Sequence, residues 1–173
     1  MAHTSHLVLP DFKKFFSDRA RAFVEGKFDT VIDALTIPTS VYVLGQMIVI
    51  NAKQDAIAAL QIYKTNLLAT RYAATRTSVL DVSEADAGKV RVRTVTAHFD
   101  GQGTELSSFE VLYFIRLMDR PEDAAADAQA SDAQVSDAQV SDAQTYEAPA
   151  FSIELIETLT PGDTRLTEGL PLL

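Results

Sequence analysis

The stretch KVRVRTVTAHFDGQGTELSSFEVLYFIRLM, residues 89–118, decides the fold class of this chain. Its two halves are rich in β-branched and aromatic residues, which favour extended backbone. The Asp100-Gly101-Gln102-Gly103 sequence between them supplies residues that tolerate the sharp backbone angles of a turn. We therefore expect two long antiparallel strands, at 89–99 and 105–118, joined by a tight turn.

The alternation of apolar side chains in the first strand predicts a bend. These side chains fall on two parities, with Val90 and Val92 on one and Val95, Ala97 and Phe99 on the other. One buried face can hold them all only if an extra residue interrupts the alternation. We therefore expect a β-bulge near Arg93 or Thr94.

The second strand is apolar on both parities between Phe109 and Leu117. Such a strand is usually covered on both of its faces. One face is expected to meet helices and the other a partner subunit, which predicts a homodimer formed through the sheet.

Helical and extended patterns order the rest of the chain. Apolar residues recur at helical spacing between the cap residue Asp11 and Gly26, which predicts a first helix. Further helices are expected at 28–35 and from 51 to about 69, and further strands at 39–44, 47–50, 72–82 and 151–159. This order predicts an α+β fold with three N-terminal helices packed on a strongly curved, mostly antiparallel sheet.

Length and composition limit the possible functions. The 173 residues, 47% of them hydrophobic, suit one domain, 1–173, and the absence of cysteine excludes disulfides and thiolate chemistry. Of the formal charge of −9, the segment 119–150 carries −7, so the remainder is almost neutral and nucleic acid is not expected as a partner. No apolar stretch is long enough to cross a bilayer and no secretion signal is present, so we expect a cytoplasmic protein without membrane contact.

A five-residue repeat, ADAQA-SDAQV-SDAQV-SDAQT, occupies residues 126–145. Its period matches neither helix nor strand, and its composition buries little apolar surface. We expect 120–146 to be an acidic low-complexity loop inserted between the last two strands. The alternative is a binding role for the repeat.

Three short segments resemble the NTF2-like superfamily, which includes ketosteroid isomerases and SnoaL-type cyclases. They are Ser40 to Gln46, Phe99 to Gln102 and Phe114 to Arg116. The order of elements is also similar. The resemblance implies a cone in which helices close a curved sheet around a ligand pocket.

The resemblance also implies roles for two residues. Tyr42 stands where ketosteroid isomerases carry the aspartate that abstracts a proton, and a phenol is a poor base at neutral pH. Glu110 stands where they carry a protonated acid that hydrogen-bonds to the developing oxyanion. Ketosteroid isomerase activity is therefore not expected.

His98 and Glu110 are the candidate catalytic residues. The reference pKa of histidine lies close to neutrality, so His98 could act as a base. Its alternative is a structural role at the strand end. Glu110 lies in an apolar strand and needs a partner, a proton or water, and its alternative to a pocket role is an ion pair with Arg93.

Ligand contacts are expected from Tyr42, Tyr63, Leu112, Phe114 and Arg116. The tyrosine hydroxyls, and that of Tyr113, could donate to a bound carbonyl, and Arg116 could clamp an anion at the pocket rim. The alternatives are tyrosines that fill the core and a salt bridge at the strand end.

These observations leave three functional hypotheses. The first is an NTF2-like protein that binds a small apolar or weakly polar molecule, with no metal and no cofactor. The second is a cofactor-independent lyase, isomerase or cyclase in which Glu110 and His98 share the acid and base roles. The third is a protein-interaction adaptor. The enzyme hypothesis requires that Tyr42, His98 and Glu110 converge on one cavity.

Overall fold

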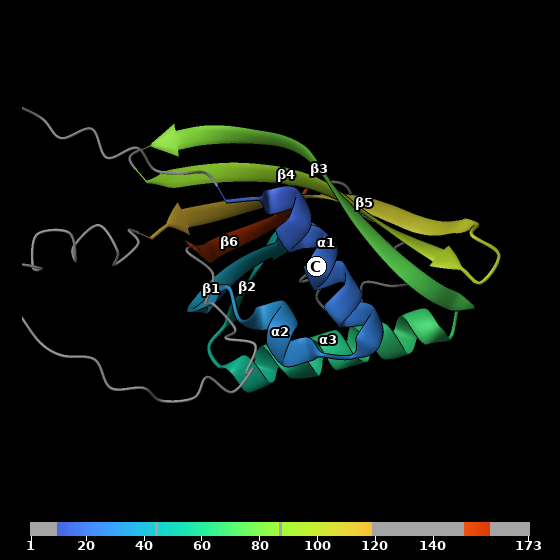
Figure 1. Ribbon diagram of the computed structural model, residues 1–173. Coiled ribbons are helices and arrows are strands. Elements are labelled where there is room, and N and C mark those ends of the chain that lie inside the picture. The colour runs from blue at the N-terminus through green and yellow to red at the C-terminus, as the bar shows by residue number, and fades with distance from the viewer. Residues whose placement is uncertain (1–9, 44, 87, 119–150, 160–173) are drawn as a thin grey trace, which may run out of the picture.

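The computed structural model describes residues 10–43, 45–86, 88–118 and 151–159 (Figure 1). The segment 120–146, expected to be an inserted loop, lies outside the described residues. The elements in chain order are α1 (Phe12–Glu25), α2 (Phe28–Ile32), β1 (Leu35–Val43), β2 (Gln46–Ile50), α3 (Lys53–Leu68), β3 (Tyr72–Asp86), β4 (Lys89–Asp100), β5 (Glu105–Leu117) and β6 (Phe151–Thr158).

Helix α1 forms where the apolar spacing predicts it. The Asp11 carboxylate accepts a hydrogen bond from the Lys14 backbone N–H at 3.0 Å and caps the first turn. Gly26 ends the helix with a φ of 78°, a left-handed conformation that suits glycine. The buried stripe of the helix consists of Phe12, Phe16, Arg19, Ala20, Ala22 and Phe23.

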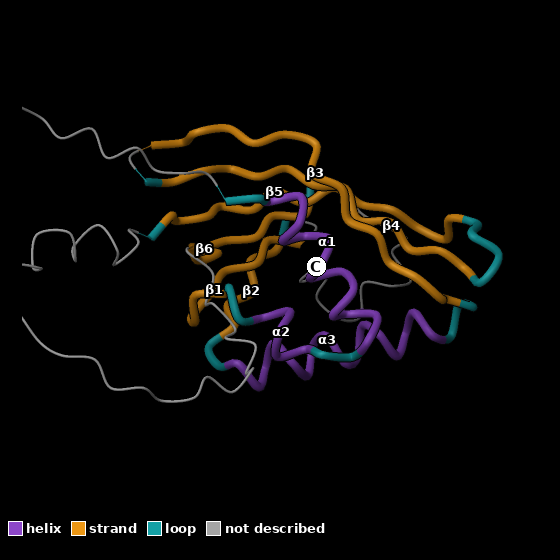
Figure 2. Tube along the Cα trace, in the orientation of Figure 1, coloured by secondary structure: helices purple, strands orange, loops and turns teal. Residues whose placement is uncertain are grey.

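The strands form one curled sheet in the order β2-β1-β6-β5-β4-β3. Strands β1 and β6 pair in parallel, and the other neighbouring strands pair antiparallel. The helices lie on the concave side of the sheet, with α1 crossing it (Figures 1 and 2). The expected α+β cone with a strongly curved, mostly antiparallel sheet is confirmed.

Strand β4 shows that the expected position of the bulge is wrong. Its buried side chains alternate without interruption and are Val90, Val92, Thr94, Thr96 and His98. The irregularity lies in the neighbouring strand β3, where Leu80 is the extra residue between the pairs Val79–Thr94 and Asp81–Arg93. The sheet buries the threonines, which have nearly the shape of valine, and turns Val95, Ala97 and Phe99 to its convex side.

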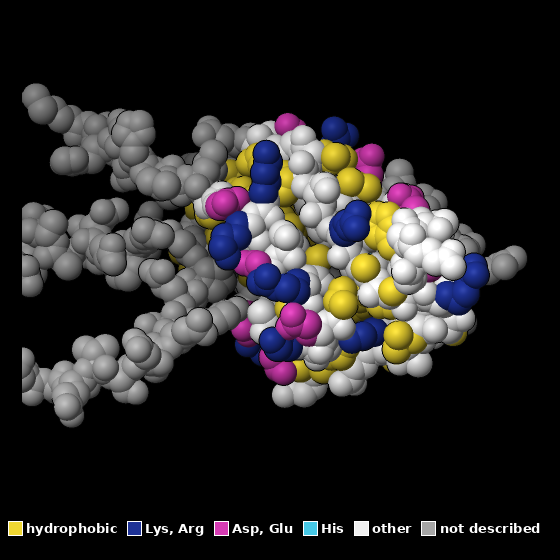
Figure 3. Space-filling view, turned by 45° about the vertical axis from the view of Figure 1, so that its right-hand side comes forward, with side chains coloured by type: hydrophobic (Ala, Val, Ile, Leu, Met, Phe, Trp, Pro, Cys, Tyr) yellow, Lys and Arg dark blue, Asp and Glu magenta, His cyan; other side chains and the backbone are white. Residues whose placement is uncertain are grey.

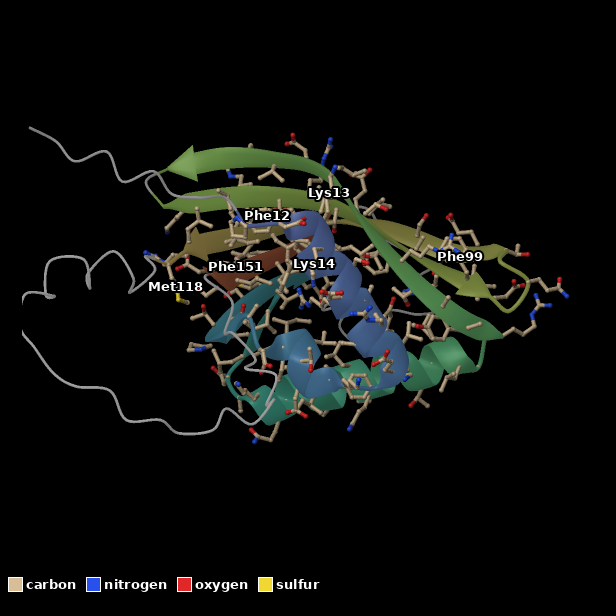
Figure 4. The ribbon with its side chains drawn as sticks, viewed as in Figure 1. Phe12, Lys13, Lys14, Phe99, Met118 and Phe151 are labelled. Atoms are coloured by element: carbon tan, nitrogen blue, oxygen red, sulfur yellow. The ribbon has the colours of Figure 1, made fainter. Side chains whose placement is uncertain are left out.

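The concave face has two ends of different chemistry. The apolar end consists of Val90, Val92, Ile115, Ile153 and Ile156, which belong to one buried core with Phe12 and Phe16 of α1. Figure 4 shows Phe12 beside Phe151 of β6 in this region, and their ring centroids lie 5.4 Å apart. The polar end consists of Thr75, Thr94, Thr96, His98 and Ser107.

Charged side chains lie mainly on the surface and are mixed in sign. On the face seen in Figure 3, Lys and Arg side chains are scattered among acidic and hydrophobic ones. On α1, Asp18 pairs with both Lys14 and Arg21. Among the described helices, none is long and apolar enough to cross a membrane.

Candidate functional site

A chain of hydrogen bonds runs through the polar end of the concave face. The Tyr63 hydroxyl on α3 lies 2.7 Å from His98 Nε2, and His98 Nδ1 lies 2.9 Å from Thr75 Oγ1. Thr75 Oγ1 in turn lies 2.7 Å from the Tyr72 hydroxyl. His98 is fully buried, with the aromatic rings of Tyr63, Tyr72 and Phe109 around it.

Burial keeps His98 neutral. Desolvation lowers its pKa from 6.5 to about 4, so one ring nitrogen donates and the other accepts at neutral pH. The four side chains together carry one N–H and three O–H hydrogens, whereas only three hydrogen bonds join them. One hydroxyl hydrogen is therefore left over in every arrangement of donors and acceptors, and it can be donated to a further acceptor.

The two tyrosines in this row of hydrogen-bonded side chains, Tyr63 and Tyr72, are hydrogen-bond donors and not bases. Desolvation by burial raises the pKa of Tyr63 and of Tyr72 above the ordinary value of 10. Neither phenol ionises at neutral pH, and neutral His98 is a weak base because its pKa is low. The chain is thus suited to orienting an acceptor such as a carbonyl.

A second group of buried polar side chains lies where the polar end meets the apolar end. The guanidinium carbon of Arg19 lies 5.6 Å from the centroid of the Tyr113 ring, and both residues are almost completely buried. Burial raises the pKa of Tyr113 to about 12 and lowers the pKa of Arg19. Thr94 Oγ1 is a neighbour of the Tyr113 hydroxyl, but within the described residues neither oxygen makes a well-formed hydrogen bond.

The structure does not bring Tyr42, His98 and Glu110 together. Tyr42 is 37% exposed and lies between the buried residues Val41 and Val43. Glu110 pairs with Val95 across the sheet, on the face opposite to His98, and its Oε2 lies 3.9 Å from Arg93 Nη1. The expectation that these three side chains share one hollow is wrong, because each strand sends alternate residues to opposite faces.

The other expected contacts divide in the same way. Tyr63 faces the concave side, whereas Leu112, Phe114 and Arg116 share the convex parity of Glu110. The guanidinium carbon of Arg91 lies over the Phe114 ring, 5.6 Å from the ring centroid. Arg116 Nε donates a hydrogen bond to the carboxylate of Glu154. This hydrogen bond lowers the pKa of Glu154.

Arg19 is the buried polar residue that sequence reasoning missed. It stands seven residues after Phe12, three after Phe16 and four before Phe23, so it falls within the apolar stripe of α1. A charged residue within an apolar stripe was the sequence signal that could have indicated a buried arginine. The signal for buried polar residues is weaker at Thr75, Thr94 and Thr96, because threonine is also common on exposed strand faces.

Helices on the concave side of a curled, mostly antiparallel sheet define the class of α+β proteins with an NTF2-like, or cystatin-like, cone. Within this class, a family model described as NTF2-like protein (DUF6841) matches residues 10–120, and the chain belongs to that family. No curated protein matches the sequence.

Solved structures share the fold at low sequence identity. A domain of unknown function with a cystatin-like fold from Nostoc punctiforme has a TM-score of 0.55 at 11% identity, over 84% of this chain and 72% of that one. An NTF2-like protein from Novosphingobium aromaticivorans has a TM-score of 0.52 at 8% identity, over 86% and 78%. An NTF2-like protein of unknown function from Shewanella oneidensis has a TM-score of 0.51 at 9% identity, over 84% and 93%. At these identities the likeness concerns the fold alone.

Proposed function

We propose that the protein binds a small, largely apolar molecule with hydrogen-bond acceptors at the polar end of its concave face. One observation carries the proposal. Four buried hydroxyl oxygens on this face make no well-formed hydrogen bond within the described residues, and they belong to Thr94, Ser107, Tyr113 and Thr158. Cross-strand pairing places them on one side of the sheet, because Thr94 and Thr158 both pair with Val111, Tyr113 pairs with Val92, and Ser107 pairs with His98.

Unpartnered hydroxyls are costly inside a protein. Each buried polar group without a hydrogen bond destabilises the fold by about 1–3 kcal/mol. A domain of ordinary stability, about 5–15 kcal/mol, tolerates several of them only with difficulty. A ligand that supplies acceptors would remove this cost, and the spare hydrogen of the Tyr63-His98-Thr75-Tyr72 chain adds a further donor.

The geometry favours binding over the lyase or isomerase alternative. General acid–base catalysis needs an acid and a base within reach of one substrate atom. Glu110 and His98 lie on opposite faces of the sheet, and the pKa of His98 is lowered to about 4. The pair therefore lacks both the convergence and the basicity that the catalytic hypothesis requires.

The convex face supports a proposal of its own, a homodimer formed through the sheet. Leu112, Phe114 and Leu155 form a half-buried apolar row there, bordered by the ion pair of Arg93 and Glu110. A surface with an apolar centre and both signs of charge at its border can face a second copy of itself across a two-fold axis. Sedimentation analysis of Phe114→Arg against wild type tests this, since a dimer held by this face should dissociate and an unchanged mass contradicts it.

Extraction of the purified protein tests ligand binding. The full chain is denatured in organic solvent, and released small molecules are identified by mass spectrometry. The double variant Thr94→Val and Tyr113→Phe removes two hydroxyls while keeping the side-chain shapes, so it should retain less of any bound molecule than wild type. The matched control is Tyr42→Phe, which removes a hydroxyl from the exposed position and should leave retention unchanged.

Two results would contradict the proposal. One is equal retention by wild type, the double variant and the control, which would place binding elsewhere. The other is the absence of any retained molecule together with no change in melting temperature on addition of a panel of small carbonyl compounds.

A further inference from the structure

The buried hydroxyls of the concave face form two groups at different positions along the strands. The first, which we call the His98 group, consists of His98, Tyr63, Tyr72, Thr75 and Ser107. The second, which we call the Tyr113 group, consists of Thr94, Tyr113 and Thr158. Ser107 in the first group and all three members of the second make no well-formed hydrogen bond through their hydroxyls within the described residues. Each group therefore has a hydroxyl that can donate to a ligand.

Strand β4 shows that the two groups are well separated. His98 and Thr94 lie four residues apart on its buried face, which corresponds to about 13 Å along an extended strand. The row of the sheet between them consists of Thr77, Thr96 and Phe109. Phe109 is 4% exposed, and the hydroxyl oxygens of the two threonines lie 3.0 Å apart and pair with each other. The middle row thus offers mainly hydrocarbon and aromatic surface.

Helix α1, which crosses the sheet (Figure 1), gives an independent measure of the separation. The Phe23 ring lies 5.9 Å from the Tyr63 ring of the His98 group. The Phe16 ring lies 4.6 Å from the Tyr113 ring of the second group. Phe16 and Phe23 stand seven residues apart, which is about 10 Å along a helix. Only an elongated molecule can therefore reach both groups.

The His98 group carries no charge at neutral pH. Burial lowers the pKa of His98 to about 4 and raises the pKa of Tyr63 and Tyr72 above the ordinary value of 10. Thr75 and Ser107 do not titrate. A charged part of a ligand would find no opposite charge within this group, and burying it there would be costly. An acceptor that suits the group is therefore uncharged, such as a carbonyl oxygen.

We propose that the ligand is an elongated, largely apolar molecule with a hydrogen-bond acceptor near each end, about 10 Å apart, and that the acceptor at the His98 group is uncharged. This inference rests on the proposed function and names the class of molecule bound. At one end, Ser107 and the spare hydrogen of the hydrogen-bonded chain donate to the ligand. At the other end, the hydroxyls of the Tyr113 group do so. The apolar middle of the molecule packs against the row that contains Phe109.

Diketones of different lengths test the number and the spacing of the acceptors. The long probe is the undecanedione with an acetyl group at each end, and its matched control is methyl nonyl ketone, which has the same number of carbons and one carbonyl. The short pair is the hexanedione with an acetyl group at each end and methyl butyl ketone. Each is titrated calorimetrically into the full chain at neutral pH. We expect undecanedione to bind about threefold to tenfold more tightly than methyl nonyl ketone, the range of one neutral hydrogen bond. The short pair should show no such preference.

Hydroxyl variants locate the two ends of the site. Ser107→Ala acts on the His98 group and Thr94→Val on the Tyr113 group, and each should reduce the preference for undecanedione over methyl nonyl ketone. The matched control is Ser108→Ala on the same strand. The Ser108 hydroxyl is exposed and donates to Glu105, so this variant should keep the preference. Circular dichroism checks that all three variants are folded.

The outcomes separate this inference from the proposed function. Equal binding of undecanedione and its monoketone by wild type, an equal preference in the short pair, or a preference that survives in either Ser107→Ala or Thr94→Val overturns the two-ended site and leaves ligand binding intact. If the probes do not bind, the molecule extracted from wild type decides. An elongated molecule with an acceptor near each end, retained less by Ser107→Ala, supports the inference, and any other molecule overturns it. The absence of both probe binding and an extracted molecule overturns the inference and the proposed function together.

Discussion

The apolar end and the polar end of the concave face share strand β4 but differ in what they bury. Val90 and Val92 are followed on the same face by Thr94 and Thr96, and all four are at most 2% exposed. Threonine and valine fill nearly the same space, so close packing does not account for the change from one to the other. Because a buried hydroxyl without a partner lowers stability, the polar end points to a role beyond holding the fold together.

The two ends also differ in their partners. The apolar end meets Phe12 and Phe16 of α1. The polar end meets Tyr63 of α3 and Tyr72 of β3, which complete the chain of hydrogen bonds through His98 and Thr75. We infer that stability is concentrated in the first region and recognition in the second. Three predictions test this division, beginning with the largest expected effect.

Removing a large side chain from the apolar end should destabilise the protein strongly. Phe16 is 1% exposed and its ring packs against those of Phe15 and Tyr113. Phe16→Ala should lower the free energy of unfolding by about 3–5 kcal/mol through lost burial and a residual cavity. Chemical denaturation followed by circular dichroism measures the change.

The control for this variant is Ile62→Ala on α3. Ile62 is 54% exposed, so its truncation should change the free energy of unfolding by no more than about 0.5 kcal/mol. A similar loss in both variants, or a loss below about 1 kcal/mol for Phe16→Ala, would show that the apolar end does not carry the stability assigned to it.

At the polar end, His98 should make stability depend on pH. Its pKa is about 4 in the folded protein and 6.5 as the reference for the unfolded chain, so the unfolded state binds the proton more readily. The contribution of His98 is complete above pH 6.5 and is lost progressively as the pH falls toward 4. Between pH 7 and pH 5 this loss should amount to about 2 kcal/mol.

Urea denaturation at several pH values measures this loss, and His98→Gln isolates it. Glutamine does not titrate, so the variant should lack the part of the pH dependence that belongs to His98. Parallel pH profiles for the two proteins would mean that His98 titrates normally, and the buried hydrogen-bonded chain would then need revision.

The sequence predicts the frame of this fold better than the facing of its strands. The helix at Phe12–Glu25 follows from the spacing of its phenylalanines and from Asp11 and Gly26, all of which act locally. The turn at 100–103 is local in the same sense, and Asp100 accepts hydrogen bonds from the backbone N–H groups of Gln102 and Thr104. Such features depend on a few neighbouring residues and can be recognised without the tertiary structure.

The candidate site depends on which face of each strand is buried, and the sequence pattern did not determine that face. On β5 residues of both parities are apolar, so the pattern did not show which face is buried; the strand buries Phe109 and sends Glu110 to the convex side, where it pairs with Arg93. On β4 the valines of both parities suggested a bulge, whereas the strand buries threonines. Tyr63 and His98, 35 residues apart, meet only because α3 packs against the sheet.

The smallest expected effects distinguish the two ends most directly, because they exchange the same pair of side chains on one strand. Val92→Thr introduces a hydroxyl into the apolar end and should lower the free energy of unfolding by about 1 kcal/mol. Thr94→Val, two residues further along the same buried face, removes a hydroxyl that makes no well-formed hydrogen bond among the described residues. It should therefore leave the unliganded protein equally stable or raise its melting temperature, while weakening ligand binding. A loss of stability in both variants would mean that the Thr94 hydroxyl contributes to folding itself, and the case for a recognition role at the polar end would lose its main physical support.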